Sequence, residues 1–389
     1  MAHLAIQALA VLALASLFMV LLMHVSVRRV LSRPAPDVTP EAVTILKPLR
    51  GIDDSLADNL ESYAHLEGEY ELLFGAEDPR DPALDVAREF CRRHPEIDAK
   101  VIVCDRVVGM NPKVIVLAQL TPHAKHPLLL VSDSNVRLKP GFLRETAAHF
   151  ADPQVGLVSN VIAGVGEKSF GSALENAHLA SFISGAISGA DVVAGQACVL
   201  GKSMMVRRRA FDRLGGWTHL RNVLAEDYFA GYRFQKAGYK VVLSGHVVET
   251  VVETWSWDRF FARHVRWSQL RRRLSPATYF LEVFLNPLPF ALTLACVGGS
   301  SGLAAGAAII ATKYASDRSI ARQLRGTPPP LAAMIGRDLL LPFVWFVGGT
   351  RTFVEWRGHR IRLGKHTRLH RPPAATSAVL AHPNRVNAT

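Results

Sequence analysis

The sequence predicts an α/β domain that lies between membrane-associated segments, and three observations support this fold class. Between residues 41 and 275, short apolar runs alternate with amphipathic stretches, as in a mostly parallel sheet with helices on both faces. An almost uninterrupted apolar run at residues 4–27 precedes this region, and a second apolar zone begins near Pro276. The chain has 389 residues, of which 49% are hydrophobic, so it is long and apolar enough for a catalytic-sized domain with membrane helices.

The N-terminal apolar run predicts a transmembrane anchor over residues 1–30. Residues 4–27 are long enough to cross the ~30 Å hydrocarbon core of a bilayer, and a group of arginines follows them, beginning with Arg28. A cleaved signal peptide instead has basic residues in front of a shorter apolar core. We therefore expect a retained anchor in an integral membrane protein, and the positive-inside rule places the following domain on the cytoplasmic side.

The central region, residues 41–275, is expected to form the catalytic domain. Apolar runs predict strands at residues 43–46, 71–75, 100–103, 128–132, 156–159, 199–206 and 240–243. Amphipathic or polar stretches predict helices at residues 55–65, 82–94, 112–120 and 141–150. The continuous apolar run at 128–132 is typical of a central parallel strand, which is buried on both faces.

The second apolar zone predicts transmembrane or interfacial helices over residues 276–355. We expect residues 279–297 to form one span and residues 303–311 a short return. Residues 334–347 are apolar but contain the adjacent pair Arg337–Asp338, and charges at membrane depth are costly unless they are paired or lie near the interface. An interfacial helix, a re-entrant segment and a third crossing all remain open for this stretch.

The end of the chain, residues 356–389, is expected to be a basic and then disordered tail. Arginine and lysine are frequent up to Lys365, whereas alanine, proline, serine and asparagine dominate from Pro372. The net charge of +12 suits an anionic membrane face, a phosphorylated substrate or nucleic acid. Because the sequence has no helix-turn-helix or zinc-finger spacing, nucleic acid is not an expected partner. The four cysteines are scattered, which excludes a disulfide framework and a zinc site.

Acidic residues follow the predicted strands at three places. Asp133 comes directly after the strand at 128–132 and is followed by Ser134 and Asn135, and Asp78 follows the strand at 71–75. A third acidic pair, Glu226–Asp227, opens a predicted helix. Each feature alone is explained by a turn or a helix end. Together they favour a site at the carboxyl edge of the sheet, where ligands bind in open α/β folds, with oxygen atoms that suit Mg²⁺ or Mn²⁺.

A predicted helix at residues 257–273 carries a basic face. Arg263 and Trp267 lie one turn apart on this helix, with Arg266 beside them. Guanidinium groups match phosphate oxygens, so this face suits a diphosphate. Contact with anionic lipid is the alternative, and for the residues 271–273 it is the preferred interpretation.

The acidic residues and the basic helix follow one another in the order of a known sequence signature. Asp78, Asp133-Ser-Asn, Ala225-Glu-Asp-Tyr and Arg263-His-Val-Arg-Trp267 resemble the D, D, D, (Q/R)xxRW signature of inverting glycosyltransferases. The surrounding sequence is similar to the ceramide glucosyltransferase family, glycosyltransferase family 21, over roughly residues 1–365. The similar blocks are Leu46-Lys-Pro-Leu-Arg-Gly51, Asp81-Pro-Ala-Leu-Asp-Val86, Gly109-Met-Asn-Pro-Lys113 and Ala225-Glu-Asp-Tyr-Phe229.

The resemblance implies a GT-A (Rossmann-like) domain and a role for each motif residue. Asp227 would be the general base, and Asp133 would bind Mg²⁺ or Mn²⁺ together with Asn135, which stands where a fuller motif has an acid. The remaining residues would bind the UDP-sugar donor: Asp78 at the uridine, Lys47 and Lys113 in the nucleotide site, and Arg263, Arg266 and Trp267 at the diphosphate.

The implied reaction moves a sugar, with glucose favoured, from a UDP-sugar to a lipid hydroxyl, with ceramide favoured, and inverts the anomeric carbon. One alternative is a hopanoid-type lipid N-acetylglucosaminyltransferase, which shares much of this layout. Another is a synthase that polymerises and exports a polysaccharide, although the few C-terminal spans argue against a channel. The third is a non-catalytic basic membrane protein that docks on anionic lipid.

Overall fold

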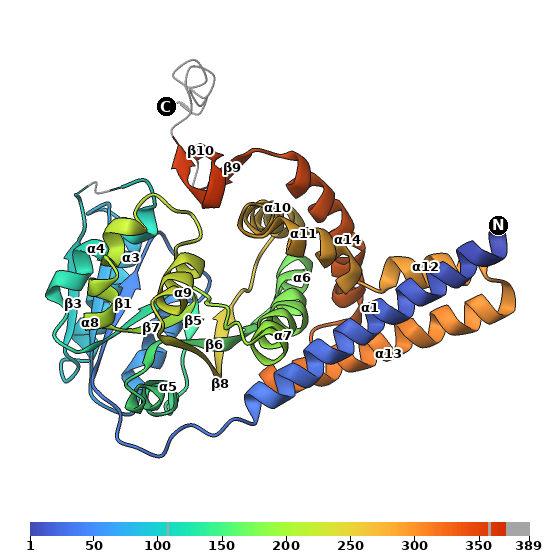
Figure 1. The fold of residues 1–389 in the computed structure, drawn as a ribbon. Helices are drawn as coiled ribbons and strands as arrows, with labels where there is room; N and C mark the ends of the chain where they lie inside the picture. Colours follow the sequence, from blue (N-terminus) through green and yellow to red (C-terminus); the bar gives the residue numbers. More distant parts are fainter. Residues whose placement is uncertain (107–108, 357–358, 371–389) are drawn as a thin grey trace.

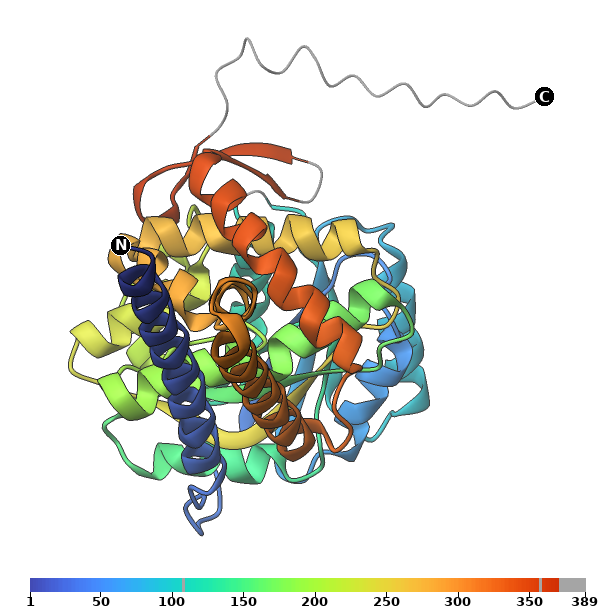
Figure 2. The ribbon, with the colours of Figure 1, turned by 90° about the vertical axis from the view of Figure 1, so that its right-hand side faces the viewer.

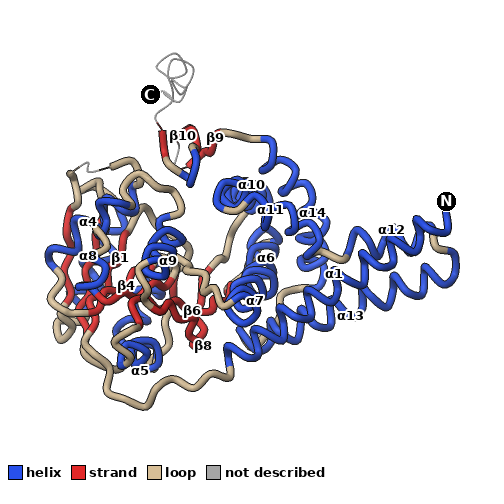
Figure 3. Tube along the Cα trace, viewed as in Figure 1, coloured by secondary structure: helices blue, strands red, loops and turns tan. Residues whose placement is uncertain are grey.

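The computed structural model describes residues 1–106, 109–356 and 359–370. A curved sheet with its covering helices forms one side of the molecule, and long helices form the other (Figures 1 and 3). The sheet has eight strands in the order β3-β2-β1-β4-β7-β6-β8-β5. Their bounds are β1 (Val43–Pro48), β2 (Tyr70–Ala76), β3 (Ala99–Val103), β4 (Leu128–Ser132), β5 (Val136–Arg137), β6 (Val155–Val165), β7 (Ser203–Arg207) and β8 (Lys240–Val251).

The strand directions divide the sheet into two parts. Strands β3, β2, β1 and β4 lie side by side and are parallel to one another, as the alternation of strands and helices predicts. Strand β7 is antiparallel to both β4 and β6, while β6 and β8 are parallel. The sequence predicted each of these strands except β5, which has only two residues. Strand β7 begins at Ser203 rather than at 199, because Gly201 and Lys202 form a turn in front of it.

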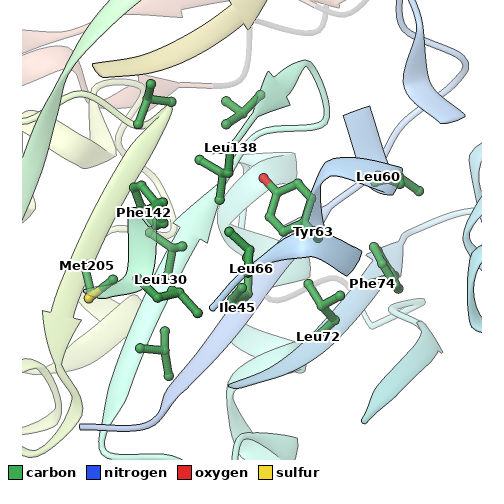
Figure 4. Packing of buried hydrophobic residues seen from close by; sticks show 14 of the residues in the cluster. Ile45, Leu60, Tyr63, Leu66, Leu72, Phe74, Leu130, Leu138, Phe142 and Met205 are labelled. Carbon is green, nitrogen blue, oxygen red and sulfur yellow. The ribbon is translucent and has the colours of Figure 1, made fainter. Parts of the chain in front are cut away.

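Helices and a hydrophobic core cover both faces of the sheet. The helices are α2 (Leu56–Glu61), α3 (Pro82–Arg93), α4 (Pro112–Leu120), α5 (Phe142–Ala147), α8 (Arg208–Arg213) and α9 (Glu226–Lys236), with short 3₁₀ turns after several of them. Because side chains alternate along a strand, Ile45 and Leu130 enter the core on one face, whereas Leu46 and Leu129 enter the core on the other. Figure 4 shows the first core, with Tyr63 reaching from the η1 turn (Ser62–His65) toward β1 and β4.

A long helical segment that the sequence did not predict packs against the sheet. It consists of α6 (Phe170–Ala177), a π-helical turn η4 (His178–Ile183) and α7 (Ser184–Ala194). Its small residues show no clear apolar period, but they let another helix approach closely. A Cβ atom added at Gly185 would lie 3.3 Å from Met23 Cβ on the N-terminal helix.

The remaining helices include the apolar segments. They are α1 (Ala2–Leu31), α10 (Trp257–Leu274), α11 (Pro276–Glu282), α12 (Leu288–Val297), α13 (Gly299–Arg325) and α14 (Leu331–Thr350). In the described part of the chain, His3–Leu31, Phe170–Ala194 and Leu331–Thr350 are long and apolar enough to cross a membrane. Figure 2 shows α1 beside α13, with α14 crossing nearby.

The predicted span at residues 279–297 is a bent pair of helices. Pro276–Leu285 and Leu288–Val297 meet at an angle of 48°, because Asn286 and Pro287 interrupt the helix between them. The predicted short return at 303–311 is the first part of the 27-residue helix α13. Residues 359–370 of the expected basic tail form strands β10 (His359–Leu363) and β11 (Leu369–His370), which join β9 (Phe353–Trp356) in a small sheet. The predicted disorder from Pro372 lies outside the described residues.

The charged pair in α14 is buried in an ion network. Arg337 Nη2 lies 3.0 Å from Asp317 Oδ2 on α13 and 2.7 Å from Asp338 Oδ1, and Lys313 pairs with both aspartates. Arg337 also donates to the carbonyl oxygen of Ala177 on α6. The positive charges of Arg337 and Lys313 are therefore balanced by the two carboxylates inside the helical bundle, where unpaired charges would be costly.

Candidate functional site

The first part of the site is a carboxylate between two ammonium groups at the end of β4. Asp133 Oδ1 lies 2.8 Å from Lys113 Nζ, and its Oδ2 lies 3.0 Å from Lys202 Nζ. The Asp133 side chain is 25% exposed, so part of it is accessible to solvent. Burial alone would raise the pKa of Asp133, but the two ammonium groups outweigh burial and hold it well below its usual range.

The fold brings these three residues together from separate elements. Lys113 lies in the first turn of α4, whose N-cap Asn111 accepts from the backbone N–H of Lys113. Lys202 directly precedes β7, and the antiparallel register pairs Ser203 with Ser132. Lys202 therefore lies across from Asp133, the residue that follows Ser132.

Lys47 supports this cluster from the buried interior of the domain. Its side chain is fully buried, and Nζ donates to the carbonyl oxygen of Asp133 at 2.7 Å and to the hydroxyl of Tyr63 at 2.6 Å. The Tyr63 hydroxyl is also 2.6 Å from Ser132 Oγ. Burial lowers the pKa of Lys47 well below its usual value, although the nearby Asp133 charge opposes this shift. Lys47 thus fixes the backbone at the end of β4.

Asn135 lies on the other side of Lys202. Its Oδ1 accepts from Lys202 Nζ at 2.5 Å, and its Nδ2 donates to the carbonyl oxygen of Val251 at 3.1 Å. Asp133 and Asn135 therefore direct oxygen atoms to the same ammonium group. Burial lowers the pKa of Lys202, against the attraction of Asp133 and with a further contribution from the positive charge of Arg263.

These oxygen atoms fit a divalent cation that binds together with a diphosphate. Among the described residues, no group of three His, Cys, Asp or Glu side chains could hold a metal ion by itself. Mg²⁺, however, usually takes one or two protein carboxylates and fills its other positions with substrate phosphates and water. The carboxylate of Asp133 and the amide oxygen of Asn135 are a suitable partial set for such a metal.

The second part of the site is the acidic pair at the start of α9. Asp227 Oδ2 accepts from the backbone N–H of Gly201 at 2.7 Å, and Oδ1 accepts from the N–H of Tyr228 at 2.8 Å. Glu226 Oε1 lies 3.2 Å from Lys113 Nζ, so Lys113 joins the acidic pair to Asp133. Burial, reinforced by the charge of Asp227, raises the pKa of Glu226 in spite of Lys113.

The third part of the site is the basic face of α10, whose first turn is capped by Ser256. The Arg263 guanidinium lies over two indole rings, 5.2 Å from the centroid of Trp255 and 4.5 Å from that of Trp267. Its Nε is 3.2 Å from Oε1 of the fully buried Glu175 on α6. The other oxygen of Glu175 bonds His264 Nε2 at 2.6 Å. These contacts fix the guanidinium in one orientation.

Asp78 lies apart from this cluster. It follows β2, which is separated from β4 by β1, and its side chain is 55% exposed. The Asp78 carboxylate contacts Arg80, which donates its backbone N–H at 2.9 Å and has its Nε at 3.5 Å. The backbone hydrogen bond from Arg80 lowers the pKa of Asp78. The uridine role of Asp78 stays a prediction, as does the diphosphate role of Arg266 on α10.

The structure adds two residues that the sequence did not predict, Lys202 and Glu175. Lys202 becomes a candidate only when β4 and β7 are known to be antiparallel neighbours. Glu175 lies in the unpredicted helix α6, and its one sequence signal is an acid within an apolar segment, which indicates a buried partner.

Comparisons with known proteins show the family to which the chain belongs. The family model described as glycosyl transferase family 21 matches residues 8–369. Ceramide glucosyltransferase 3 of Caenorhabditis elegans is 28% identical over 343 residues, covering 84% of this chain and 74% of that protein. Ceramide glucosyltransferase 1 of the same species is 30% identical over 264 residues, covering 66% of this chain and 55% of that protein.

One solved structure shares the fold. The mannosyltransferase PcManGT from Pyrobaculum calidifontis, in complex with GDP-Man and Mn²⁺, has a TM-score of 0.51 and 16% sequence identity, with 88% of this chain and 96% of that chain covered. The predicted GT-A fold is thereby confirmed.

Proposed function

Because this chain belongs to glycosyltransferase family 21, we propose that it transfers a sugar from a UDP-sugar to a hydroxyl of ceramide and inverts the anomeric carbon. The observation that carries the proposal is the position of Lys113, which lies 2.8 Å from Asp133 and 3.2 Å from Glu226. Lys113 therefore links a diphosphate-type site at the sheet edge to the carboxylate pair Glu226–Asp227, which is suited to acid–base chemistry.

The cationic groups provide the donor site. Lys113 and Lys202, from α4 and the turn before β7, contact Asp133 at the end of β4. Burial lowers the pKa of Lys202, and the charge of Arg263 on α10 lowers it further. A diphosphate has several negative oxygens that can replace Asp133 as partners of the two lysines. Arg263 would contact the same group, and these fixed cations would stabilise the charge that UDP gains as it leaves. A divalent cation held by Asp133 and Asn135 would supply further stabilisation of that charge.

Asp227 is the proposed general base. The backbone N–H groups of Gly201 and Tyr228 hold its carboxylate in place, and Glu226 beside it is paired with Lys113. A lipid hydroxyl is a weak nucleophile, so a carboxylate that removes its proton during attack would accelerate the reaction. Attack opposite the departing UDP inverts the anomeric carbon without a covalent sugar intermediate.

The helices explain how a lipid acceptor would reach the site. Arg263 and Trp267 lie on α10, which packs against α6, α11 and α14. Helices α6 and α14 belong to candidate membrane spans, and α11 belongs to the bent apolar pair. We place the catalytic domain on the cytoplasmic side, because the arginines that follow the apolar part of α1 favour that orientation. Glucose is the proposed sugar, since the curated relatives named above are ceramide glucosyltransferases.

A transfer assay on the purified protein in nanodiscs tests this proposal. Ceramide and a hopanoid polyol are each offered UDP-glucose, UDP-N-acetylglucosamine or UDP-galactose, and the lipid products are identified by mass spectrometry. We expect a β-hexosyl ceramide from UDP-glucose. Transfer of an N-acetylhexosamine to the hopanoid would show that the proposed sugar and lipid are wrong. The absence of both product and UDP binding would favour the lipid-docking alternative.

A matched pair of variants tests the base. Asp227→Asn removes the charge but keeps the shape, and the loss of a general base is expected to lower kcat by about 10²–10⁴-fold. Asp212→Asn, at a half-exposed aspartate near Arg208, is the control and should keep full activity. Full turnover by Asp227→Asn with normal donor binding would exclude Asp227 as the base.

A further inference from the structure

A cationic pocket lies at the C-terminal end of α10. It has a volume of about 700 Å³ and is lined by Arg273, Thr352, Arg362, Lys365 and His370, among others. Arg273 belongs to α10, whereas the other four come from the small C-terminal sheet and its connections. Figure 1 shows this sheet, β9 and β10, close to α10 and to the end of α14.

The pocket carries uncompensated positive charge. No aspartate or glutamate is among its lining residues. Within the described residues, no carboxylate forms an ion pair with Arg273, Arg362 or Lys365, in contrast to Arg271, which pairs with Glu282 at 2.7 Å. Burial lowers the pKa of Arg273, and the like charges of Arg272 and Arg362 lower it further. An anion in the pocket would relieve this repulsion.

The pocket also lies where two apolar segments leave the domain. Arg273 is followed by α11, which begins at Pro276 and forms the first half of the bent apolar pair. Thr352 comes directly after α14, which ends at Thr350 and is a candidate membrane span. Large apolar side chains on α11 and α14 are exposed, including Phe280 at 57% and Phe346 at 65%. The pocket therefore lies at the ends of two apolar segments, where lipid headgroups would meet a chain that enters the membrane.

We propose that this pocket binds the phosphate group of an anionic membrane phospholipid. Arginine and lysine side chains recognise phosphate through charge-assisted hydrogen bonds, and clusters of them beside membrane helices attract anionic lipid. The pocket is distinct from the donor site, because Arg273 lies ten residues after Arg263 on the same helix, or about 15 Å along its axis.

The same sheet that carries the pocket also holds the segment in front of the base. The Thr367 carbonyl oxygen accepts from the N–H of Leu224 at 3.0 Å, and its hydroxyl accepts from the N–H of Ala225 at 3.3 Å. Leu369 donates its N–H to the carbonyl oxygen of Asn222 at 2.9 Å. A phosphate held between Arg273 and Arg362 would fix the sheet against α10, and through Thr367 it would order the segment that leads into Asp227. If Asp227 is the general base, ordering this segment should raise the turnover of sugar transfer. That effect rests on the proposed function, whereas lipid binding does not.

Lipid binding is tested first, without reference to activity. The full-length protein is reconstituted in nanodiscs of phosphatidylcholine with added phosphatidylglycerol. It is then released from them, and the lipid that it retains is measured by native mass spectrometry. The wild type is expected to retain phosphatidylglycerol in preference to phosphatidylcholine. At a contribution near 1 kcal/mol for each basic residue, the double variant Arg362→Gln, Lys365→Gln should lose about fivefold in affinity for each charge removed.

A charge-matched control separates the pocket from general surface charge. Arg209→Gln, Lys236→Gln removes two exposed basic residues from α8 and α9, and it should retain lipid as the wild type does. If both double variants retain phosphatidylglycerol equally well, the proposal is overturned. Arg362 and Lys365 are exposed, so folding is expected to survive, and a Tm measurement checks this.

Activity then tests the coupling, and inorganic phosphate tests the source of the anion. Turnover of the wild type should rise when phosphatidylglycerol is added to phosphatidylcholine nanodiscs, and the Arg362→Gln, Lys365→Gln variant should not respond. If inorganic phosphate alone gives the same rise and displaces the retained lipid, the site is one for a soluble anion and the lipid assignment is wrong. If no sugar transfer occurs with any lipid, the proposed function fails while the binding result stands.

Discussion

Replacing Glu175 by glutamine is expected to damage the donor site through Arg263. The carboxylate is fully buried and divides its two oxygens between Arg263 Nε at 3.2 Å and His264 Nε2 at 2.6 Å. Glutamine keeps the shape but offers one neutral acceptor in place of two charged ones. The Arg263 side chain is only 16% exposed, so it would lose its counter-charge in a place where water cannot replace it well.

The size of the effect follows from these contacts. Removing one partner of a buried ion pair costs about 3–5 kcal/mol. The two indole contacts of Arg263 are present before and after the substitution, so they do not change this difference. We therefore expect the free energy of unfolding to fall by about 3–5 kcal/mol. If Arg263 stabilises the leaving diphosphate, its lost orientation should lower kcat/KM for the UDP-sugar by about 10²–10³-fold, as for other preorganised donors.

The assay measures kcat and KM for the donor in nanodiscs, together with Tm, for Glu175→Gln, Arg263→Gln and the double variant. Because Glu175 is argued to act through Arg263, the double variant should be little worse than Arg263→Gln alone. Glu89→Gln, at a half-exposed glutamate on α3, is the control for loss of one carboxylate. Losses that simply add in the double variant, or a lower Tm with unchanged kcat/KM, would refute the positioning role.

Three further predictions concern the other groups of the site. Lys202→Met should raise KM for the donor roughly tenfold to a hundredfold, because a charge-assisted hydrogen bond is worth about 1.5–3 kcal/mol. Lys202→Arg should restore part of the donor affinity, and an unchanged KM in Lys202→Met would show that Lys202 contacts Asp133 alone and not the donor. Chelation with EDTA should abolish transfer, and added Mg²⁺ or Mn²⁺ should restore it, whereas activity that persists after exhaustive chelation would rule out a required metal. The raised pKa of Glu226 means that the folded state binds its proton more tightly than the unfolded state, so this residue should reduce stability as pH rises from about 4.3, the unfolded value, through the raised folded value. Glu226→Gln should therefore gain in Tm relative to the wild type between acidic and neutral pH, and a constant difference would contradict the assignment.

Local sequence patterns were sufficient where a site residue lies next to the element that positions it. Asp133 follows the apolar run of β4, and Arg263 and Trp267 share a helix, so the predictions of strand end and helix face hold in the structure. The fold class was predictable for the same reason. In the parallel half, each strand is a short apolar run and each helix an amphipathic stretch, so both types of element can be recognised locally.

Long-range pairing was not predictable from those patterns. Lys202 meets Asp133 only through the antiparallel register of β4 and β7, and Lys47 is buried under the Asp133 backbone by a sheet arrangement that no local period encodes. The helix α6 to α7 was missed because glycine, serine and alanine dilute its apolar pattern. The ion network around Arg337 depends on three separate helices. The partners of Arg337 and Asp338 could therefore not be predicted from the sequence, and the position of α14 relative to the membrane stayed open.

The close packing of α1 against α7 and β8 has a practical consequence for work with this protein. Val27 and Val30 are fully buried, and a Cβ atom at Gly245 would lie 2.5 Å from the carbonyl oxygen of Val30. The last turns of this helix therefore complete the hydrophobic core of the catalytic half instead of only tethering it. Deleting α1 to obtain a water-soluble enzyme should expose this seam and yield aggregates, and exchanging it for an unrelated apolar helix should fail unless the valine pattern of the last turns is kept.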